Sequence, residues 1–200
     1  MRMFVAITPP PAVLEDLDEF LGPRRDTWPG RWTAPEQWHL TLAFMESVPD
    51  RALDGLLERL TTAADRRTPF AVSLSGAGAF PDPARAKVLY AGVRTVHGAT
   101  ELERLAAGAR AAAVAAGVEV EGGRFRPHVT VARTGRPLEA TRWLRVLDSY
   151  SGPSWTVDEI ALIASHLGEG PRGRPRHEVV ATAVLGGETA KRRGNPPLAG

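Results

Sequence analysis

Two short segments of the chain share the pattern His, apolar residue, Thr, apolar residue: HLTL at 39–42 and HVTV at 128–131. An alternation with a period of two is typical of a β-strand, in which residues two apart face the same side. Each segment is therefore expected to place one His and one Thr on a common surface, with two apolar residues packed behind them. A pair of such segments is a stronger signal than either segment alone.

The residue types in these segments suit proton transfer at a phosphate group. His39 and His128 can act as a general acid and a general base, because imidazole has a pKa of about 6.5. The hydroxyls of Thr41 and Thr130 can donate hydrogen bonds to phosphate oxygens without adding charge. Arg133 can neutralise a phosphate as a bidentate donor. Strict alternation puts Arg133 on the opposite face from His128, so this role requires the strand to end or bulge there.

Several other kinds of chemistry are not indicated. The chain has no Cys, which excludes disulfides, a thiol nucleophile and thiolate metal ligands. It has no His-x-His or His-Glu-x-x-His motif and no Gly-rich phosphate loop, so we expect no metal and no cofactor. Arg accounts for 23 of the 25 basic residues. This bias is compatible with a phosphate or nucleic-acid ligand, although the codon usage of a GC-rich genome explains it more simply.

The elements that must position these residues can be predicted from apolar periodicity. Strands are expected at 3–7, 38–44, 70–79, 87–93, 125–133, 154–165 and 177–185. Helices are expected at 12–21, 49–64, 100–116 and 138–147. The order strand, helix, His-bearing strand, helix, strand occurs in both halves, which suggests an internal duplication.

This order predicts an α+β fold in which duplicated β-α-β-α-β units form two lobes of antiparallel sheet around a central groove, with helices outside. The two His-bearing strands would face each other across the groove. Residues 1–185 would form a single two-lobed domain and residues 186–200 a disordered tail. No apolar stretch is long enough for a membrane span, and we expect a cytoplasmic monomer.

Two aromatic residues beside the first motif and the three remaining histidines are further candidates for the site. Trp38 and Phe44 flank the first motif and could stack on a nucleobase. Strict alternation places Phe44 on the core side with the two leucines of the motif, so a core position is favoured. The other three histidines are expected at the surface or in loops: His97, His166 and His177.

Together, the opening strand MFVAI and the extended motifs WHLTLAF and FRPHVTVAR resemble the two-histidine phosphoesterase superfamily. The nearest branch is that of the bacterial LigT-like RNA 2′,3′-cyclic phosphodiesterases, and the likeness runs from about Met3 to Leu185. The resemblance implies hydrolysis of RNA 2′,3′-cyclic phosphate ends, including those of tRNA fragments, to 2′-phosphomonoesters. It also implies 2′-5′ RNA ligation, in which a ribose hydroxyl replaces water.

The resemblance also implies roles for the residues of the two motifs. His39 would be the proton donor to the departing 3′ oxygen, and His128 the proton acceptor that activates water. Thr41 and Thr130 would hold the phosphate oxygens. The chain departs from the family pattern at Glu46, where the family has Gly, and at His177, where it has Tyr.

Two alternatives stay open at this point. The chain could be a non-catalytic RNA- or tRNA-binding module that keeps the fold, or a phosphodiesterase for a different small cyclic nucleotide. The presence of both His and both Thr favours an enzyme, because binding alone needs no matched acid and base.

Overall fold

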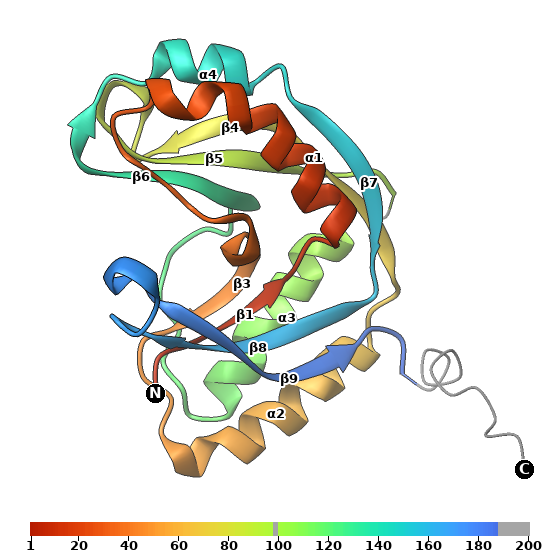
Figure 1. The fold of residues 1–200 in the computed structure, drawn as a ribbon. Coiled ribbons are helices and arrows are strands. Elements are labelled where there is room, and N and C mark those ends of the chain that lie inside the picture. The colour runs from red at the N-terminus through yellow and green to blue at the C-terminus, as the bar shows by residue number, and fades with distance from the viewer. Residues whose placement is uncertain (98–99, 188–200) are drawn as a thin grey trace, which may run out of the picture.

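The protein, described by a computed structural model, has an α+β fold in which one antiparallel sheet is strongly curled into a half-barrel and flanked by helices (Figure 1). The structure describes residues 1–97 and 100–187. The strands are β1 (Met3–Ile7), β2 (Arg31–Trp32), β3 (Leu40–Met45), β4 (Phe70–Phe80), β5 (Ala86–Thr95), β6 (His128–Leu138), β7 (Ser151–Val157), β8 (Glu159–His166) and β9 (Arg176–Val184). The helices are α1 (Pro11–Leu21), α2 (Asp50–Asp65), α3 (Glu101–Ala115) and α4 (Thr141–Leu147).

The sheet has the strand order β7-β4-β5-β6-β3-β1-β8-β9, with the two-residue strand β2 paired to β6. The two motif strands, β3 and β6, are neighbours at its centre and pair at Leu40 and Val129. The α+β class and the antiparallel pairing agree with the prediction. The expected position of the motif strands on opposite walls is wrong, because one continuous sheet carries both.

The helices cover the outside of the curled sheet, two for each half (Figure 1). Helix α1 follows β1 but packs on β7, at the other end of the strand order, and α4 packs on β4. Helix α3 follows β5 but packs on β3 and on α2, which in turn contacts β8 and β9. Each half of the chain thus contributes to both halves of the sheet. An internal duplication stays a prediction.

The predicted strand 154–165 is in fact two strands that meet at Asp158. Strand β7 pairs with β4, whereas β8 pairs with β1 and β9. The carbonyl of Asp158 accepts a hydrogen bond from the backbone N–H of Leu185 at 2.7 Å, which fixes the chain where it passes from one half of the sheet to the other. A continuous Val- and Ile-rich run gives no sign of this break.

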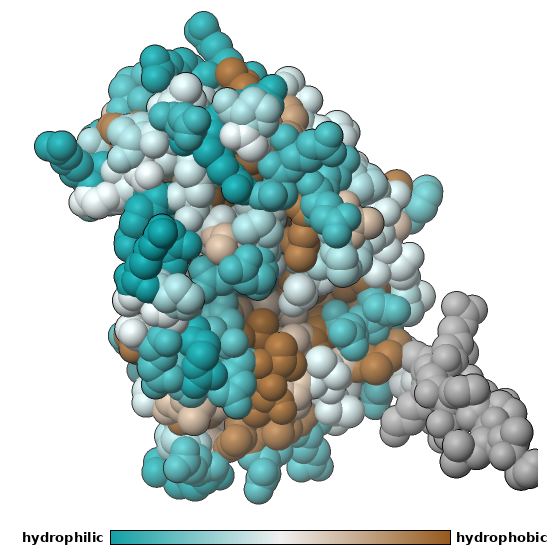
Figure 2. Space-filling model, in the orientation of Figure 1, coloured by the Kyte–Doolittle hydropathy of each residue, from teal (hydrophilic) through white to brown (hydrophobic). Residues whose placement is uncertain are grey.

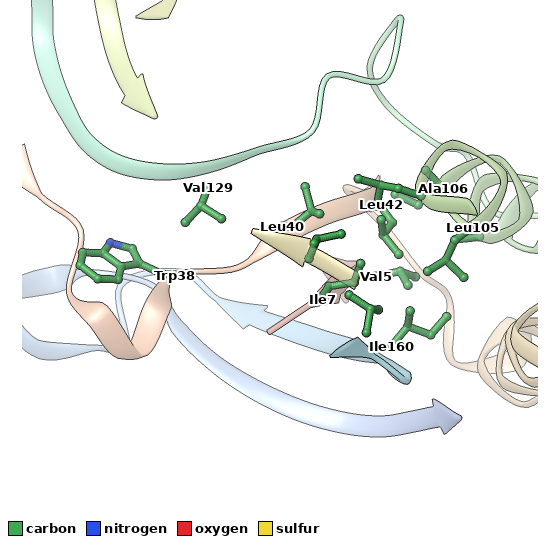
Figure 3. Close-up of a cluster of buried hydrophobic side chains, with 14 of the residues drawn as sticks. Val5, Ile7, Trp38, Leu40, Leu42, Leu105, Ala106, Val129 and Ile160 are labelled. Carbon is green, nitrogen blue, oxygen red and sulfur yellow. The ribbon is translucent and has the colours of Figure 1, made fainter. Parts of the chain in front are cut away.

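The apolar residues of the two motifs pack into the main core, as their alternation predicts. Leu40 and Leu42 are 1% and 2% exposed and lie with Val5, Ile7 and Val129 (Figure 3).

A second, smaller cluster lies on the other face of β1 and β8. It consists of Phe4, Ala6, Ala161 and Ile163, with Phe44 packed against it. The area of the surface over β8 and β9 is also apolar (Figure 2). None of the described helices is long and apolar enough to cross a membrane. The predicted tail, 186–200, lies outside the described residues except for its first two.

Candidate active site

All five residues proposed from the sequence line one cleft of about 390 Å³: His39, Thr41, His128, Thr130 and Arg133. The remaining lining residues come from the N-terminal residues 2–4, from β3, from the segment 31–37 and from the segment 165–177. They are Arg2, Phe4, Arg31, Trp32, Thr33, Gln37, Phe44, Ser165, Leu167, Gly173, Arg174, Pro175 and His177. Residues far apart in the chain therefore converge on a single site.

The pairing of β3 with β6 explains how the two motifs meet. Leu40 lies opposite Val129, and each of them follows its histidine directly. Continued by one residue on each side of this pair, the antiparallel register places His39 directly opposite Thr130, and Thr41 directly opposite His128. Each histidine therefore lies next to the threonine of the other motif, so the four polar side chains can surround one small anion.

A β-bulge follows the threonine in each motif. Opposite β1, Ala6 pairs with Thr41 and Val5 with Ala43, which leaves Leu42 as the extra residue. Opposite β5, Tyr90 pairs with Thr130 and Leu89 with Ala132, which leaves Val131 as the extra residue.

An extra residue reverses the alternation beyond it, so the side chain five positions after each histidine returns to the cleft face. These side chains are Arg133 in the second motif and Phe44 in the first, and both line the cleft. The bulge that Arg133 requires is therefore present. For Phe44 the bulge makes the favoured core position wrong.

The two histidines are held in the same way. The Nδ1–H of His39 donates to the carbonyl oxygen of Gln37 at 2.7 Å, and that of His128 donates to the carbonyl oxygen of Arg126 at 2.7 Å. Because a carbonyl oxygen can only accept, Nδ1 carries the hydrogen in both rings. In the neutral ring, Nε2 is then an acceptor, and it is the nitrogen left for a substrate.

Aromatic rings hold each imidazole in place. His39 stacks on Phe4, with ring centroids 4.5 Å apart and an interplanar angle of 23°, and His177 meets its edge at 5.4 Å. On the other side of the site, Phe80 and Tyr90 lie 4.9 and 5.2 Å from His128. Such packing limits ring rotation and keeps the reactive nitrogens in a fixed position.

Both histidines are neutral at pH 7 in the unliganded site. Burial lowers the pKa of His39 to about 4, with smaller contributions from the nearby His177, Arg133 and His128, while the hydrogen bond to the Gln37 carbonyl acts in the opposite direction. Burial and Arg133 also lower the pKa of His128 below its ordinary value. Binding of an anion would offset these effects, because a nearby negative charge favours the imidazolium form.

The cleft is strongly suited to anions. Arg2, Arg31, Arg133 and Arg174 line it, and none of the lining residues in the described part of the chain is acidic. The guanidinium of Arg2 lies over the ring of Phe44, 4.6 Å from its centroid. Within residues 1–97 and 100–187, no group of three or more His, Cys, Asp or Glu side chains is placed to hold a metal ion.

Four flanking residues differ from the sequence-based expectation or clarify it. Trp38 is 1% exposed and belongs to the core, so it cannot stack on a bound base (Figure 3). His177, expected at the surface or in a loop, lies on β9 and lines the cleft beside His39. His166 is turned away from the cleft toward Glu178, at 3.2 Å, whereas its neighbour Ser165 lines the cleft. Glu46 is exposed and is not among the lining residues.

Gln37 is a site residue that the sequence does not reveal. Its carbonyl holds His39, and its side-chain Nε2 donates to the carbonyl oxygen of Pro175 at 2.7 Å. The same residue thus ties His39 to the segment that carries Arg174 and Pro175 along the cleft. No motif marks this link, since the two partners are 138 residues apart.

A curled antiparallel sheet with two His-x-Thr motifs at its centre defines the LigT-like fold class. The family model described as the 2′-5′ RNA ligase superfamily matches residues 9–169, and the chain belongs to this superfamily. Among solved structures, TT0787 of Thermus thermophilus has a TM-score of 0.76 and 29% identity and covers 94% of this chain and 100% of its own. Apo LigT of E. coli has a TM-score of 0.70 and 27% identity over 92% of this chain and 96% of its own.

Curated relatives carry the name RNA 2′,3′-cyclic phosphodiesterase. The relative from Thermus thermophilus is 30% identical, over 98% of this chain and 96% of its own length. The relative from Geobacillus stearothermophilus is 27% identical over 96% of this chain, which spans only 59% of the length of that protein. This homology suggests phosphodiesterase activity.

Proposed function

We propose that this protein hydrolyses the 2′,3′-cyclic phosphate ends of RNA to 2′-phosphomonoesters by paired histidine acid–base catalysis that needs no metal. The observation that carries the proposal is the matched placement of His39 and His128. Both line one cleft in which none of the described lining residues is acidic, and both are bonded through Nδ1 to a backbone carbonyl, which leaves Nε2 for the substrate. The names of the relatives support RNA as the substrate.

The proposed reaction begins with a cyclic phosphodiester anion between the two motifs. The hydroxyls of Thr41 and Thr130 donate to its non-bridging oxygens, and Arg133 balances its negative charge. Neutral His128 removes a proton from water through Nε2 as the water oxygen attacks phosphorus. The bond from phosphorus to the 3′ oxygen breaks, and the imidazolium of His39 gives its Nε2 proton to that oxygen.

The products are a 2′-phosphomonoester, a free 3′ hydroxyl, a neutral His39 and a protonated His128. Exchange of protons with solvent restores the starting state. The acid must be protonated before the reaction, so the low pKa of His39 in the empty site requires that the bound phosphate raise it. A ribose hydroxyl in the place of water would give 2′-5′ ligation with the same groups.

An assay with an oligonucleotide that ends in a 2′,3′-cyclic phosphate, in the presence of a chelator, tests the proposal. We expect wild type to open the ring and His39→Ala and His128→Ala to lose at least roughly 100-fold in rate, as is typical for removal of a general acid or base. Fluorescence anisotropy should show that both variants still bind the oligonucleotide. His97→Ala is the control, because His97 is exposed and is not among the lining residues.

The same assay separates the alternatives. Wild type and His128→Ala that bind RNA equally but are equally inert would identify a binding module. Hydrolysis of another small cyclic nucleotide in preference to the RNA end would identify a different phosphodiesterase.

A further inference from the structure

Arg31 lies directly opposite Arg133 across two paired strands. The two-residue strand β2 pairs with β6 so that Arg31 faces Arg133 and Trp32 faces Ala132. Side chains of directly opposed residues in an antiparallel pair lie on the same face, and both of these arginines line the cleft. Two positive charges are thus placed side by side at one end of the site.

This arrangement is unfavourable in the absence of a ligand. Like charges directly opposite each other destabilise a strand pair. In the described part of the chain neither arginine forms an ion pair, and no acidic residue lines the cleft. Burial also lowers the pKa of Arg133 below its ordinary value. An anionic ligand is what would relieve the repulsion.

The surrounding structure is built to hold the pair together. The backbone N–H of Thr33 donates to the carbonyl oxygen of Val131 at 2.9 Å, which continues the pairing of β2 beyond Trp32. The indole N–H of Trp32 donates to the carbonyl oxygen of Arg25 at 2.9 Å. At Gly30, a Cβ would overlap the carbonyl oxygen of Arg133 and the indole of Trp28, so only glycine permits this close approach.

We propose that Arg31 forms a second phosphate subsite that holds the internucleotide phosphate on the 5′ side of the terminal nucleotide. The inference rests on the proposed function. A cyclic phosphodiester carries one negative charge, which Arg133 matches, so the charge of Arg31 is left for another anion. In an RNA strand the nearest further anion is the next phosphodiester, and the backbones that carry Arg31 and Arg133 are paired, one strand spacing of about 4.8 Å apart.

The subsite would make the enzyme select RNA chains over single nucleotides. The preference would depend on the 5′ phosphate rather than on the second nucleoside. Three substrates separate these contributions: a nucleoside 2′,3′-cyclic phosphate, the same compound with a 5′ phosphate, and a dinucleotide that ends in the cyclic phosphate.

The experiment measures kcat/KM for the three substrates with wild type, Arg31→Gln and Arg59→Gln. Arg59 is an exposed arginine on α2, outside the cleft, and serves as the charge-matched control. We expect wild type to prefer the dinucleotide and the 5′-phosphorylated compound about 10-fold or more over the plain nucleotide, as one hydrogen-bonded charge pair provides. Arg31→Gln should remove most of this ratio, and Arg59→Gln should preserve it.

Salt dependence gives a second readout. One additional phosphate contact should make kcat/KM fall more steeply with salt for the dinucleotide than for the plain nucleotide, because salt screens the added charge pair. Arg31→Gln should abolish the difference between the two slopes.

Binding of the same three ligands to His128→Ala, with and without Arg31→Gln, repeats the comparison without turnover. If wild type hydrolysed none of the three substrates, the proposed function would be contradicted. The preference of His128→Ala for binding the dinucleotide and the 5′-phosphorylated compound would still test the subsite. Equal use of the three substrates, or an equal loss on all three in Arg31→Gln, would overturn the subsite and leave the proposed function standing. The second result would mean that Arg31 shares the reacting phosphate with Arg133.

Discussion

The low pKa of His39 should be measurable as a dependence of stability on pH. Burial holds this pKa at about 4 in the folded protein, below the ordinary value of 6.5 that applies to the unfolded chain. Between pH 6.5 and 4 the unfolded state therefore binds more protons, so acidification favours unfolding. The contribution of His39 is complete above pH 6.5 and is lost as the pH falls through this window. A pKa shift of this size lowers the free energy of unfolding by about 3 kcal/mol below pH 4 and by about 2 kcal/mol at pH 5.

Urea unfolding at pH 7 and pH 5, followed by tryptophan fluorescence, provides the assay. Carboxylates also titrate in this range, so the informative quantity is the difference between wild type and His39→Gln. We expect wild type to lose about 2 kcal/mol more than His39→Gln between the two pH values. His97→Gln should behave as wild type, because His97 is exposed. Equal losses in wild type and His39→Gln would refute the claim that the imidazole is buried in its neutral form.

The same titration should shape the kinetics. The pH profile of kcat/KM reports the free enzyme, in which the pKa values of His39 and His128 both lie below 6.5. We therefore expect a bell-shaped profile with its optimum below pH 6.5 and a fall of about tenfold per pH unit on the alkaline side. The profile of kcat should extend to higher pH, because bound phosphate raises both pKa values. A kcat/KM profile that is flat from pH 5 to 9 would contradict paired acid–base catalysis.

Three further changes should have separable effects. Gly30→Ala should lower the free energy of unfolding by about 1–3 kcal/mol in urea titrations and raise KM, because the new Cβ pushes β2 away from β6. Gly22→Ala is the control and should be nearly neutral, because the space around Gly22 is open. Thr130→Val should lower kcat/KM roughly tenfold without unfolding the protein, because it removes a hydroxyl that lines the cleft. Thr156→Val is the control and should leave the steady-state kinetics unchanged, because Thr156 is exposed. An unchanged kcat/KM in Thr130→Val would exclude the phosphate contact. Gln37→Leu should raise KM more than it lowers kcat, because it frees the Pro175 carbonyl, and an unchanged KM would show that this hydrogen bond does not position the cleft wall.

Regular elements could be predicted from the sequence because their periodicity is local. Strand β1 occupies the predicted residues, and the helices begin and end within three residues of their predicted positions. Helix α3 ends just before Gly117, as expected for a glycine at that position, and Gly117 adopts the left-handed conformation with φ +74°. The convergence of the two motifs could also be expected, because each carries the same polar face.

Features that depend on a neighbouring strand could not be predicted. A prediction from alternation assumes that each residue pairs with one residue of the neighbouring strand. The bulges at Leu42 and Val131 break this one-to-one pairing and have no local signature, although they bring Phe44 and Arg133 to the cleft. A strand of two residues has no period, so the sequence does not distinguish the segment around Arg31 from a loop.

The contacts of Gln37 and His177 with His39 are tertiary and have no local signature either. The sheet order likewise depends on long-range packing. This packing places β4 beside β5 and β7, and β8 beside β1, so each of these strands lies among strands from the other half of the chain.

The central claim is that His39 and His128 act together on one cyclic phosphate. Phosphorus NMR of the reaction, with an oligonucleotide that ends in a 2′,3′-cyclic phosphate and a chelator present, tests it most directly. The claim predicts that wild type converts the cyclic resonance into that of a 2′-phosphomonoester and that neither His39→Ala nor His128→Ala does so at a comparable rate. Formation of the 3′-phosphomonoester, or turnover that survives either substitution, would contradict it.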